Sequence, residues 1–401
     1  MLAISREIVA RFTFYSCATI SCLLLSTAFQ ARSDSEVLPS PTGRYQTGRM
    51  TFHWTDTERE ELETRAAGDK RELMVHIFYP GDASAPGMRA PYLPDADLLR
   101  RDWNETQIST METMRSYSRE NAPLPSDKTR YPVAIFLPGR GTKVLMYQAL
   151  IEDLASHGWV VAAIDQTYNA PVRFPDGRVL GNLFPAEDGW PDAKTNTNSY
   201  NARILHRARD VGFVIDELTA LDNGNGPFAR RLDLKRGVGV FGHSLGGTTA
   251  GTVRLLDKRV ASSVNLDGVG GNGAFILAKG PRAGGLQPIM WILARSVEHE
   301  TWHPYRALAL VSGGGLRIYL NRPGFTHRDF SDEPFWNVSM SPDERSAKLQ
   351  AIAEIREWVR TFFESTVRGD RVGLERFIHR PGTVTPNTVR VLGPLLRPQI
   401  R

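Results

Sequence analysis

The sequence predicts an α/β protein with a mostly parallel central sheet and helices on both faces. Short, nearly unbroken apolar runs, typical of strands buried on both faces, alternate with longer stretches whose apolar residues recur at helical spacing. The chain has 401 residues, of which 41% are hydrophobic and 23% are charged. This composition is that of a globular protein with a large core.

The expected elements follow one another along the chain. Strands are expected at 73–80, 131–141, 159–165, 237–243, 260–267, 287–293 and 316–322. Helices are expected at 145–158, 201–221, from the Ser244 turn to about Leu256, and at 348–365. Gly158 is a typical helix stop, and the helix at 201–221 carries its apolar residues on one face. Ligands of such sheets bind at the carboxyl ends of the strands.

The N-terminus is typical of a secretory signal peptide over residues 1–28. Arg6 and Arg11 precede an uncharged segment at 12–29, and small residues suit cleavage after Ala28. An uncleaved membrane anchor is the alternative, because 18 residues just reach spanning length. We therefore expect a secreted or periplasmic protein.

The rest of the chain is divided into three parts. A flexible leader is expected at 29–42, a single α/β domain at 43–380 and a C-terminal tail at 381–401.

Cys17 and Cys22 both lie in the signal peptide, so the mature chain would have no disulfide and no thiol nucleophile. The net charge of +5 is spread along the chain, which argues against nucleic-acid binding and favours a solvated basic surface.

The stretch GVGVFGHSLGG places Ser244 between an apolar strand and a helix. Gly242 and Gly246 flank the serine, in the Gly-x-Ser-x-Gly pattern of a nucleophile elbow. The pattern alone arises by chance in many proteins, but the strand before it and the helix after it make a strained functional turn the favoured interpretation. The alternative is a glycine-bounded turn with an idle serine.

A serine nucleophile needs a base, and the base needs an orienting carboxylate. After this kind of turn, the acid and then the base follow in the chain. The histidines beyond Ser244 are His299, His303, His327 and His379. His327 is the predicted base, because it lies in a glycine-bearing loop just after the strand at 316–322. A surface-loop histidine without a catalytic task is the alternative.

The acid has two candidates. Asp267 ends the strand directly after the nucleophile helix, whereas Glu298 follows the next strand and lies among mixed polar residues. Asp267 is favoured, although aspartate also commonly caps turns. Two backbone N–H groups must face the oxyanion, and we expect them from Leu245 and Arg140. No metal-ligand motif is present, and no cofactor is expected.

Several segments resemble the platelet-activating factor acetylhydrolase type II family in its bacterial branch. They lie between about residues 43 and 369 and include AIFLPGRG, LASHGWVVAAID, RLDLKRGVGVFGHSLGG, NLDG and GFTHRDFSD. The resemblance implies an α/β-hydrolase fold and a calcium-independent serine esterase. Its substrates would be small esters or phospholipids with short or oxidised acyl chains, reached through transient contact with a membrane surface.

The resemblance also assigns the site. It implies Ser244 as nucleophile, Asp267 as acid, His327 as base, and Leu245 and Arg140 as oxyanion donors. One departure concerns the loop before Arg140, where Pro138-Gly139 stands in place of the His-Gly pair of many relatives. The departure keeps the backbone donor but puts the shape of the pocket in question.

Two further features have more than one interpretation. The segment 169–191 is predicted to be a cap over the site or a long surface loop. Trp302, Phe335 and Trp336 would line an acyl pocket or pack structurally.

Two alternatives to an acetylhydrolase-type esterase stay open. One is a lipase or polyester hydrolase with a more open cleft, and the other is a binding protein that has lost catalysis.

Overall fold

The computed structural model describes residues 38–64, 66–181, 193–268, 287–294, 315–320, 322, 324–337, 339–378 and 389–392. Their strands form one large sheet with the order β14-β13-β12-β11-β10-β5-β6-β2-β1-β4-β3, to which β9 adds beside β5. The six strands from β13 to β6 run parallel to one another. The predicted α/β class with a mostly parallel sheet is confirmed.

The element bounds are as follows. The main strands are β1 (Gln46–Glu60), β2 (Lys70–Gly81), β3 (Arg89–Pro91), β4 (Arg115–Glu120), β5 (Tyr131–Leu137), β6 (Val160–Gln166), β9 (Leu232–Asp233), β10 (Val238–His243), β11 (Val260–Leu266), β12 (Ile289–Leu293), β13 (Gly315–Tyr319) and β14 (Val389–Leu392). A separate hairpin holds β7 (Val172–Arg173) and β8 (Val179–Leu180). The helices are α2 (Glu105–Thr113), α3 (Gln148–Ser156), α4 (Ala193–Asn223), α5 (Leu245–Leu256), α8 (Glu333–Trp336), α9 (Pro342–Phe363) and α10 (Arg371–Ile378). Shorter turns are η1 (Ala96–Leu99), η2 (Val144–Tyr147), η5 (His327–Phe330) and η6 (Glu364–Arg368).

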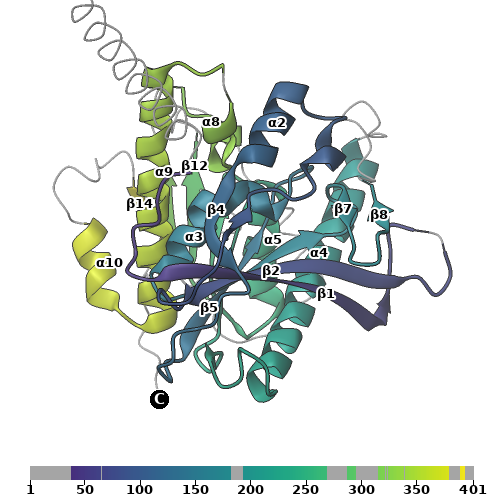
Figure 1. Ribbon diagram of the computed structural model, residues 1–401, viewed down its shortest axis with the longest axis horizontal. Coiled ribbons are helices and arrows are strands. Elements are labelled where there is room, and N and C mark those ends of the chain that lie inside the picture. Colours follow the sequence, from purple (N-terminus) through teal and green to yellow (C-terminus); the bar gives the residue numbers. More distant parts are fainter. Residues whose placement is uncertain are drawn as a thin grey trace, which may run out of the picture.

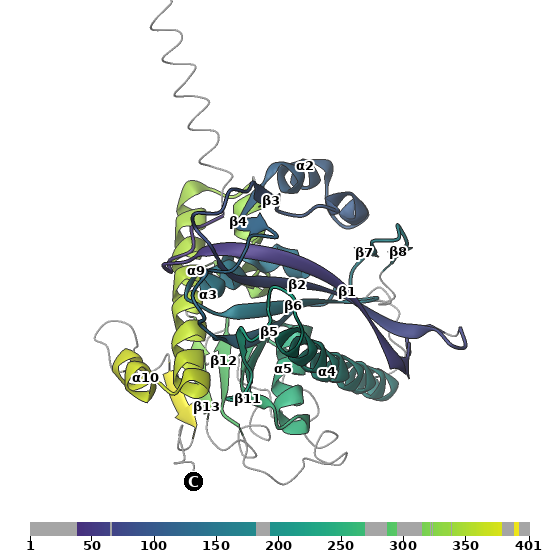
Figure 2. The same cartoon turned by 60° about the horizontal axis from the view of Figure 1, so that its bottom comes forward.

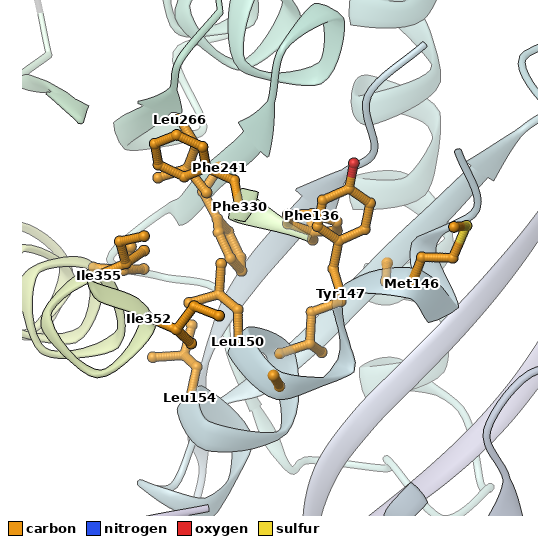
Figure 3. Packing of buried hydrophobic residues seen from close by; sticks show 14 of the residues in the cluster. Phe136, Met146, Tyr147, Leu150, Leu154, Phe241, Leu266, Phe330, Ile352 and Ile355 are labelled. Carbon is orange, nitrogen blue, oxygen red and sulfur yellow. The ribbon is translucent and has the colours of Figure 1, made fainter. Parts of the chain in front are cut away.

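Helices cover both faces of the sheet, as Figures 1 and 2 show. Side chains of a strand alternate between its two faces, so β5 contributes Phe136 to one cluster and Ile135 to the other. The first cluster packs under α3 and α9, and the second packs under α4 and α5. In Figure 3, Leu150 and Leu154 of α3 and Ile352 of α9 meet over the sheet. These two layers fix the carboxyl ends of the parallel strands.

The central elements were predicted well and the outer ones poorly. The predicted helix at 201–221 extends over Ala193–Asn223, and the one at 145–158 begins as the tighter turn η2. Strand β1 was not predicted, because it has no continuous apolar run and includes many polar side chains, and most of its residues are half-buried or exposed. It pairs antiparallel with β2 along most of its length.

Described residues on both sides of the predicted domain at 43–380 also contact it. The last residues of the expected leader are held on the domain, because Leu38 is buried and Arg356 donates to the carbonyl oxygens of Pro39 and Ser40. In the expected tail, β14 pairs antiparallel with β13 and so joins the sheet. Backbone hydrogen bonding to an open sheet edge explains this addition.

The predicted signal peptide at 1–28 lies outside the described residues. Among the helices that are described, none combines the length and apolar character needed to cross a membrane.

Candidate active site

Ser244 occupies a sharp turn between β10 and α5. Its φ of 53° and ψ of −117° lie in a region that non-glycine residues rarely adopt. The flanking glycines are required by close backbone approach: a Cβ atom on Gly246 would lie 2.2 Å from the carbonyl oxygen of Leu137. The turn therefore raises the serine side chain above the carboxyl ends of the strands.

His327 reaches the serine from a loop that follows β13. The loop is fixed by Asp329, whose Oδ2 accepts hydrogen bonds from Thr326 N at 2.6 Å and Thr326 Oγ1 at 2.8 Å. Lys348 of α9 donates to the other oxygen of Asp329 at 2.8 Å. A local capping box and a bond to a long helix thus hold the turn that begins with His327.

Asp267 follows β11 directly and has a positive φ of 51°. Its N–H donates to the carbonyl oxygen of Ile292 at 2.8 Å, and its Oδ1 accepts a bond from Ala294 N at 3.1 Å. Both partners lie at the end of the neighbouring strand β12. The carboxylate is therefore held at the same edge of the sheet as Ser244, with Oδ2 left to face the histidine.

The three side chains form one continuous hydrogen-bonded chain. His327 Nδ1 lies 2.6 Å from Asp267 Oδ2, and His327 Nε2 lies 2.9 Å from Ser244 Oγ. The Asp267 side chain is 7% exposed, whereas that of His327 is 44% exposed. The acid is thus shielded while the base faces solvent, which is the arrangement in which a carboxylate orients an imidazole and a substrate can reach the serine.

The two predicted oxyanion donors belong to two different segments of the chain, the start of α5 and the loop after β5. Leu245 is the first residue of α5, so its N–H has no partner within the helix and lies at the positive end of the helix dipole. Arg140 lies in the loop after β5. Asn169 closes this loop, because its side-chain amide donates to the carbonyl oxygens of Gly139 at 2.9 Å and Thr142 at 3.0 Å.

Asp332 is a buried aspartate that no sequence pattern singles out. It connects the loop that carries His327 to α3. Asp332 lies five residues after His327, and its oxygens accept bonds from Gln148 N at 2.7 Å and Ala149 N at 3.1 Å. Asp332 thereby caps the first turn of α3, which has no capping side chain of its own. Burial raises the pKa of Asp332 to about 7, although the Ala149 N–H, the Tyr92 hydroxyl and the Gln148 N–H act in the opposite direction.

The other residues considered as pocket-lining side chains, acid or base are either buried or outside the described residues. Phe335 and Trp336 are buried, and Trp336 packs edge-on against Trp103 with ring centroids 4.8 Å apart, so these two side chains pack structurally. The other candidates, which are Glu298, His299, Trp302, His303 and His379, lie outside the described residues. The structure brings Asp267 to His327 and does not place Glu298.

The segment 169–191 is described only as far as residue 181. Its β7–β8 hairpin is attached to the β1–β2 ribbon, because Phe174 stacks on His53 with ring centroids 4.5 Å apart and Arg178 donates to both oxygens of Glu72. Within the part of the chain that the structure describes, no group of three or more potential metal ligands is present.

Comparison with known proteins adds two kinds of similarity. Residues 30–171 match the family model described as platelet-activating factor acetylhydrolase, isoform II. A probable 1-alkyl-2-acetylglycerophosphocholine esterase from the fungus Arthroderma benhamiae is 23% identical over 339 residues, covering 79% of this chain and 81% of that protein. The platelet-activating factor acetylhydrolase of the dog, Canis lupus familiaris, is 28% identical over 172 residues, or 37% of each chain.

A solved structure extends the similarity over nearly the whole fold. A ferulic acid esterase from Streptomyces cinnamoneus superposes with a TM-score of 0.68 and is 28% identical. The match covers 89% of this chain and 99% of that one.

Proposed function

Since the chain is an α/β-hydrolase related to the isoform II platelet-activating factor acetylhydrolases and is a carboxylic-ester hydrolase, we propose that Ser244, His327 and Asp267 form its catalytic triad. The observation that carries this proposal is the position of His327, which contacts Ser244 Oγ through one ring nitrogen and Asp267 through the other. This is the geometry in which a serine hydroxyl becomes a nucleophile.

The proposed reaction has two halves. Ser244 Oγ attacks the ester carbonyl while its proton passes to His327 Nε2, and the N–H groups of Leu245 and Arg140 stabilise the oxyanion. The tetrahedral intermediate then expels the alcohol, which takes the proton from His327, and leaves an acyl group on Ser244. Water attacks this ester by the same route and releases the carboxylic acid. Asp267 holds the ring orientation and stabilises the imidazolium throughout.

We propose that the substrates are esters of short or truncated acyl groups, including phospholipids with a short sn-2 chain. The named activity of the fungal relative, an esterase of an acetylated glycerophosphocholine, supports this class. The test is kcat/KM over a C2 to C16 series of nitrophenyl esters, together with an acetylated glycerophosphocholine. We expect acetyl and butyryl esters to be hydrolysed fastest. A maximum at C12 or longer, with activation at an emulsion surface, would instead support a lipase.

A second substrate class has support from the ferulic acid esterase, which matches this chain over almost its entire fold. Methyl ferulate is therefore included beside the acetyl esters in the same assay. If kcat/KM is higher for methyl ferulate than for nitrophenyl acetate despite the poorer leaving group, the acyl site is built for aromatic acids. Labelling of Ser244 by a fluorophosphonate probe, checked by mass spectrometry, separates both enzyme functions from a catalytically silent binding protein.

We also propose that the protein is exported and that residues 1–28 are removed. The family match begins at residue 30, just after the predicted cleavage position, which supports this division of the chain. N-terminal sequencing of the protein recovered after export should begin at Phe29. Recovery of a membrane-bound chain that retains Met1 would instead support the uncleaved anchor.

A further inference from the structure

The hydroxyl group of Tyr147 lies at the centre of a buried set of contacts beside the candidate active site. Tyr147 is fully buried at the end of η2, just before α3. Its oxygen lies 3.2 Å from Gly139 N, 2.9 Å from Thr142 Oγ1 and 2.9 Å from His243 Nδ1. In Figure 3 the ring extends from the start of α3, with its oxygen pointing away from the aliphatic side chains of the cluster.

One assignment of hydrogen atoms satisfies every one of these contacts. The Tyr147 oxygen accepts from the Gly139 N–H and from a protonated His243 Nδ1, and its own hydrogen is donated to Thr142 Oγ1. Thr142 then donates to the carbonyl oxygen of Gly139 at 2.9 Å. The hydroxyl therefore uses its single donor and both acceptor sites, and it holds two points of the 139–142 loop.

The same hydroxyl also fixes the ring beneath the proposed base. His243 directly precedes Ser244, and its ring centroid lies 4.5 Å from that of His327 and 5.5 Å from that of Phe330. Burial, with the charge of the neighbouring His327, lowers the pKa of His243 to about 3. His243 is therefore neutral when His327 accepts a proton, and it supports the ring of His327 without repelling its charge.

The space around the hydroxyl is closely filled. A Cβ atom on Gly139 would lie 3.0 Å from His243 Nδ1 and 3.1 Å from the Tyr147 oxygen, so the loop backbone packs directly on both side chains. Burial raises the pKa of Tyr147 to about 12, so the phenol remains protonated across the working range of an esterase. The hydroxyl hydrogen that Tyr147 donates to Thr142 is therefore present near neutral pH.

We propose that Tyr147 is a positioning residue for ester hydrolysis. Its hydroxyl sets the distance between the loop that presents the Arg140 N–H and the strand that presents Ser244, and through His243 it orients His327. This inference rests on the proposed function, because it assigns Tyr147 to the oxyanion site and the base of that mechanism. Without the hydroxyl, a single packing defect would loosen both.

The direct test is Tyr147→Phe, which removes one oxygen atom and keeps the ring. Its matched control is Tyr79→Phe, because Tyr79 is equally buried and its hydroxyl donates to the backbone carbonyl of Ala122, on a different part of the sheet. We expect Tyr147→Phe to lower kcat for nitrophenyl acetate by about 10- to 100-fold, since displacements of order 1 Å at a reacting site have effects of this size. KM should change by less than about threefold, and Tyr79→Phe should keep kcat within about twofold.

A second readout separates positioning from simple loss of stability. The affinity of an alkyl boronic acid, whose adduct with the serine mimics the tetrahedral intermediate, should fall in Tyr147→Phe by about the same factor as kcat/KM. If Tyr147→Phe and Tyr79→Phe have equal kcat and equal boronate affinity, Tyr147 only fills the core and the proposal is wrong. Wild-type activity and fluorophosphonate labelling are measured beside them, so that a failure of the proposed function is seen in the wild type itself.

A second variant keeps the proposal testable if Tyr147→Phe folds poorly. Thr142→Val removes the hydroxyl that accepts the Tyr147 hydrogen, at a half-buried position. It should lower kcat in the same direction but by a smaller factor. In the double variant the two effects should combine to less than their product, because both break one set of hydrogen bonds. Independent, multiplicative effects on kcat would contradict the proposal.

Discussion

Two groups of ionisable side chains differ in burial, in pairing and in backbone conformation. One is the ion cluster formed by Arg71, Glu61 and Asp210, whose side chains are 1%, 2% and 0% exposed. The other is the active-site chain of Ser244, His327 and Asp267, in which the His327 side chain is 44% exposed. In both groups a carboxylate is hydrogen-bonded to a nitrogen of another side chain.

The difference lies in how completely each group is satisfied. In the ion cluster, Arg71 donates two bonds to Asp210, at 2.7 and 3.1 Å, and a third to Glu61 at 2.7 Å. Because the three side chains are buried and their charges are paired with one another, none of them is open to a substrate. In the active site, Ser244 and Asp267 are held at positive φ and the base opens to solvent. Burial with complete pairing indicates a structural role, whereas backbone strain and a base exposed to solvent indicate chemistry.

The largest effect is expected from Ser244→Ala. Loss of a triad nucleophile lowers kcat by about 10⁶-fold in a comparable enzyme, and the melting temperature should not fall, since alanine removes only a surface-facing hydroxyl. Nitrophenyl acetate turnover and thermal unfolding are the measurements. Ser263→Ala, in a buried serine of the neighbouring strand β11, is the control and should retain activity. Persistent turnover in Ser244→Ala would move the chemistry elsewhere.

The next effect is expected from Asp267→Asn. An amide cannot hold the His327 ring in the tautomer that accepts the serine proton, so kcat should fall by roughly 10⁴-fold. Glu298→Gln should have a mild effect, and the comparison is made on the same substrate. A strong loss in Glu298→Gln with little change in Asp267→Asn would assign the acid to Glu298.

In the ion cluster the same kind of change should act on stability alone. Asp210→Ala leaves Arg71 buried without its main partner, which costs about 3–5 kcal/mol of unfolding free energy. Urea denaturation measures this loss, and kcat of the folded fraction should equal that of the wild type. A fall in kcat at unchanged stability would mean that the ion cluster takes part in the reaction.

The smallest effect is expected in the pH dependence of stability. Burial acts to raise the pKa of Glu61, but the neighbouring His206 and Arg71 outweigh it and lower the pKa to about 2 from an ordinary 4.5. A lowered pKa means that Glu61 stabilises the fold fully above about pH 4.5, and that this contribution is lost as the pH falls toward 2. The difference in unfolding free energy between wild type and Glu61→Gln should therefore shrink over that range.

Glu375→Gln, at an exposed position, is the control for this pH series. Its difference from the wild type should stay small throughout. A wild-type advantage over Glu61→Gln that is the same at pH 3 and pH 6 would show that the charge of Glu61 is not responsible.

The sequence was sufficient for the strands that carry the site and for the residues at their ends. Apolar runs predict β5, β6, β10 and β11 because strands buried on both faces need them. The positions of Ser244, Asp267 and His327 at strand ends then follow from chain order. The structure brings these three residues together, and their catalytic roles remain a prediction.

What could not be predicted depends on contacts between distant residues. Tyr147 and His243 are 96 residues apart, and Asp332 caps a helix 184 residues before it. Neither pairing leaves a local pattern, because a tyrosine in an apolar run and an aspartate in a polar loop are common. Strand β14 was assigned to a tail for the same reason, since a four-residue strand is defined only by its neighbour β13.

The backbone at Ser244 also has a consequence for how the protein would change under selection. A serine at this conformation stores of order 1–3 kcal/mol, whereas glycine adopts it freely at an entropic disadvantage of roughly 0.5–1 kcal/mol. Laboratory evolution that selects for thermal stability alone would therefore enrich glycine at position 244 and yield variants that are more stable but inactive. Laboratory evolution of a more heat-stable enzyme from this chain therefore requires selection for turnover in every round.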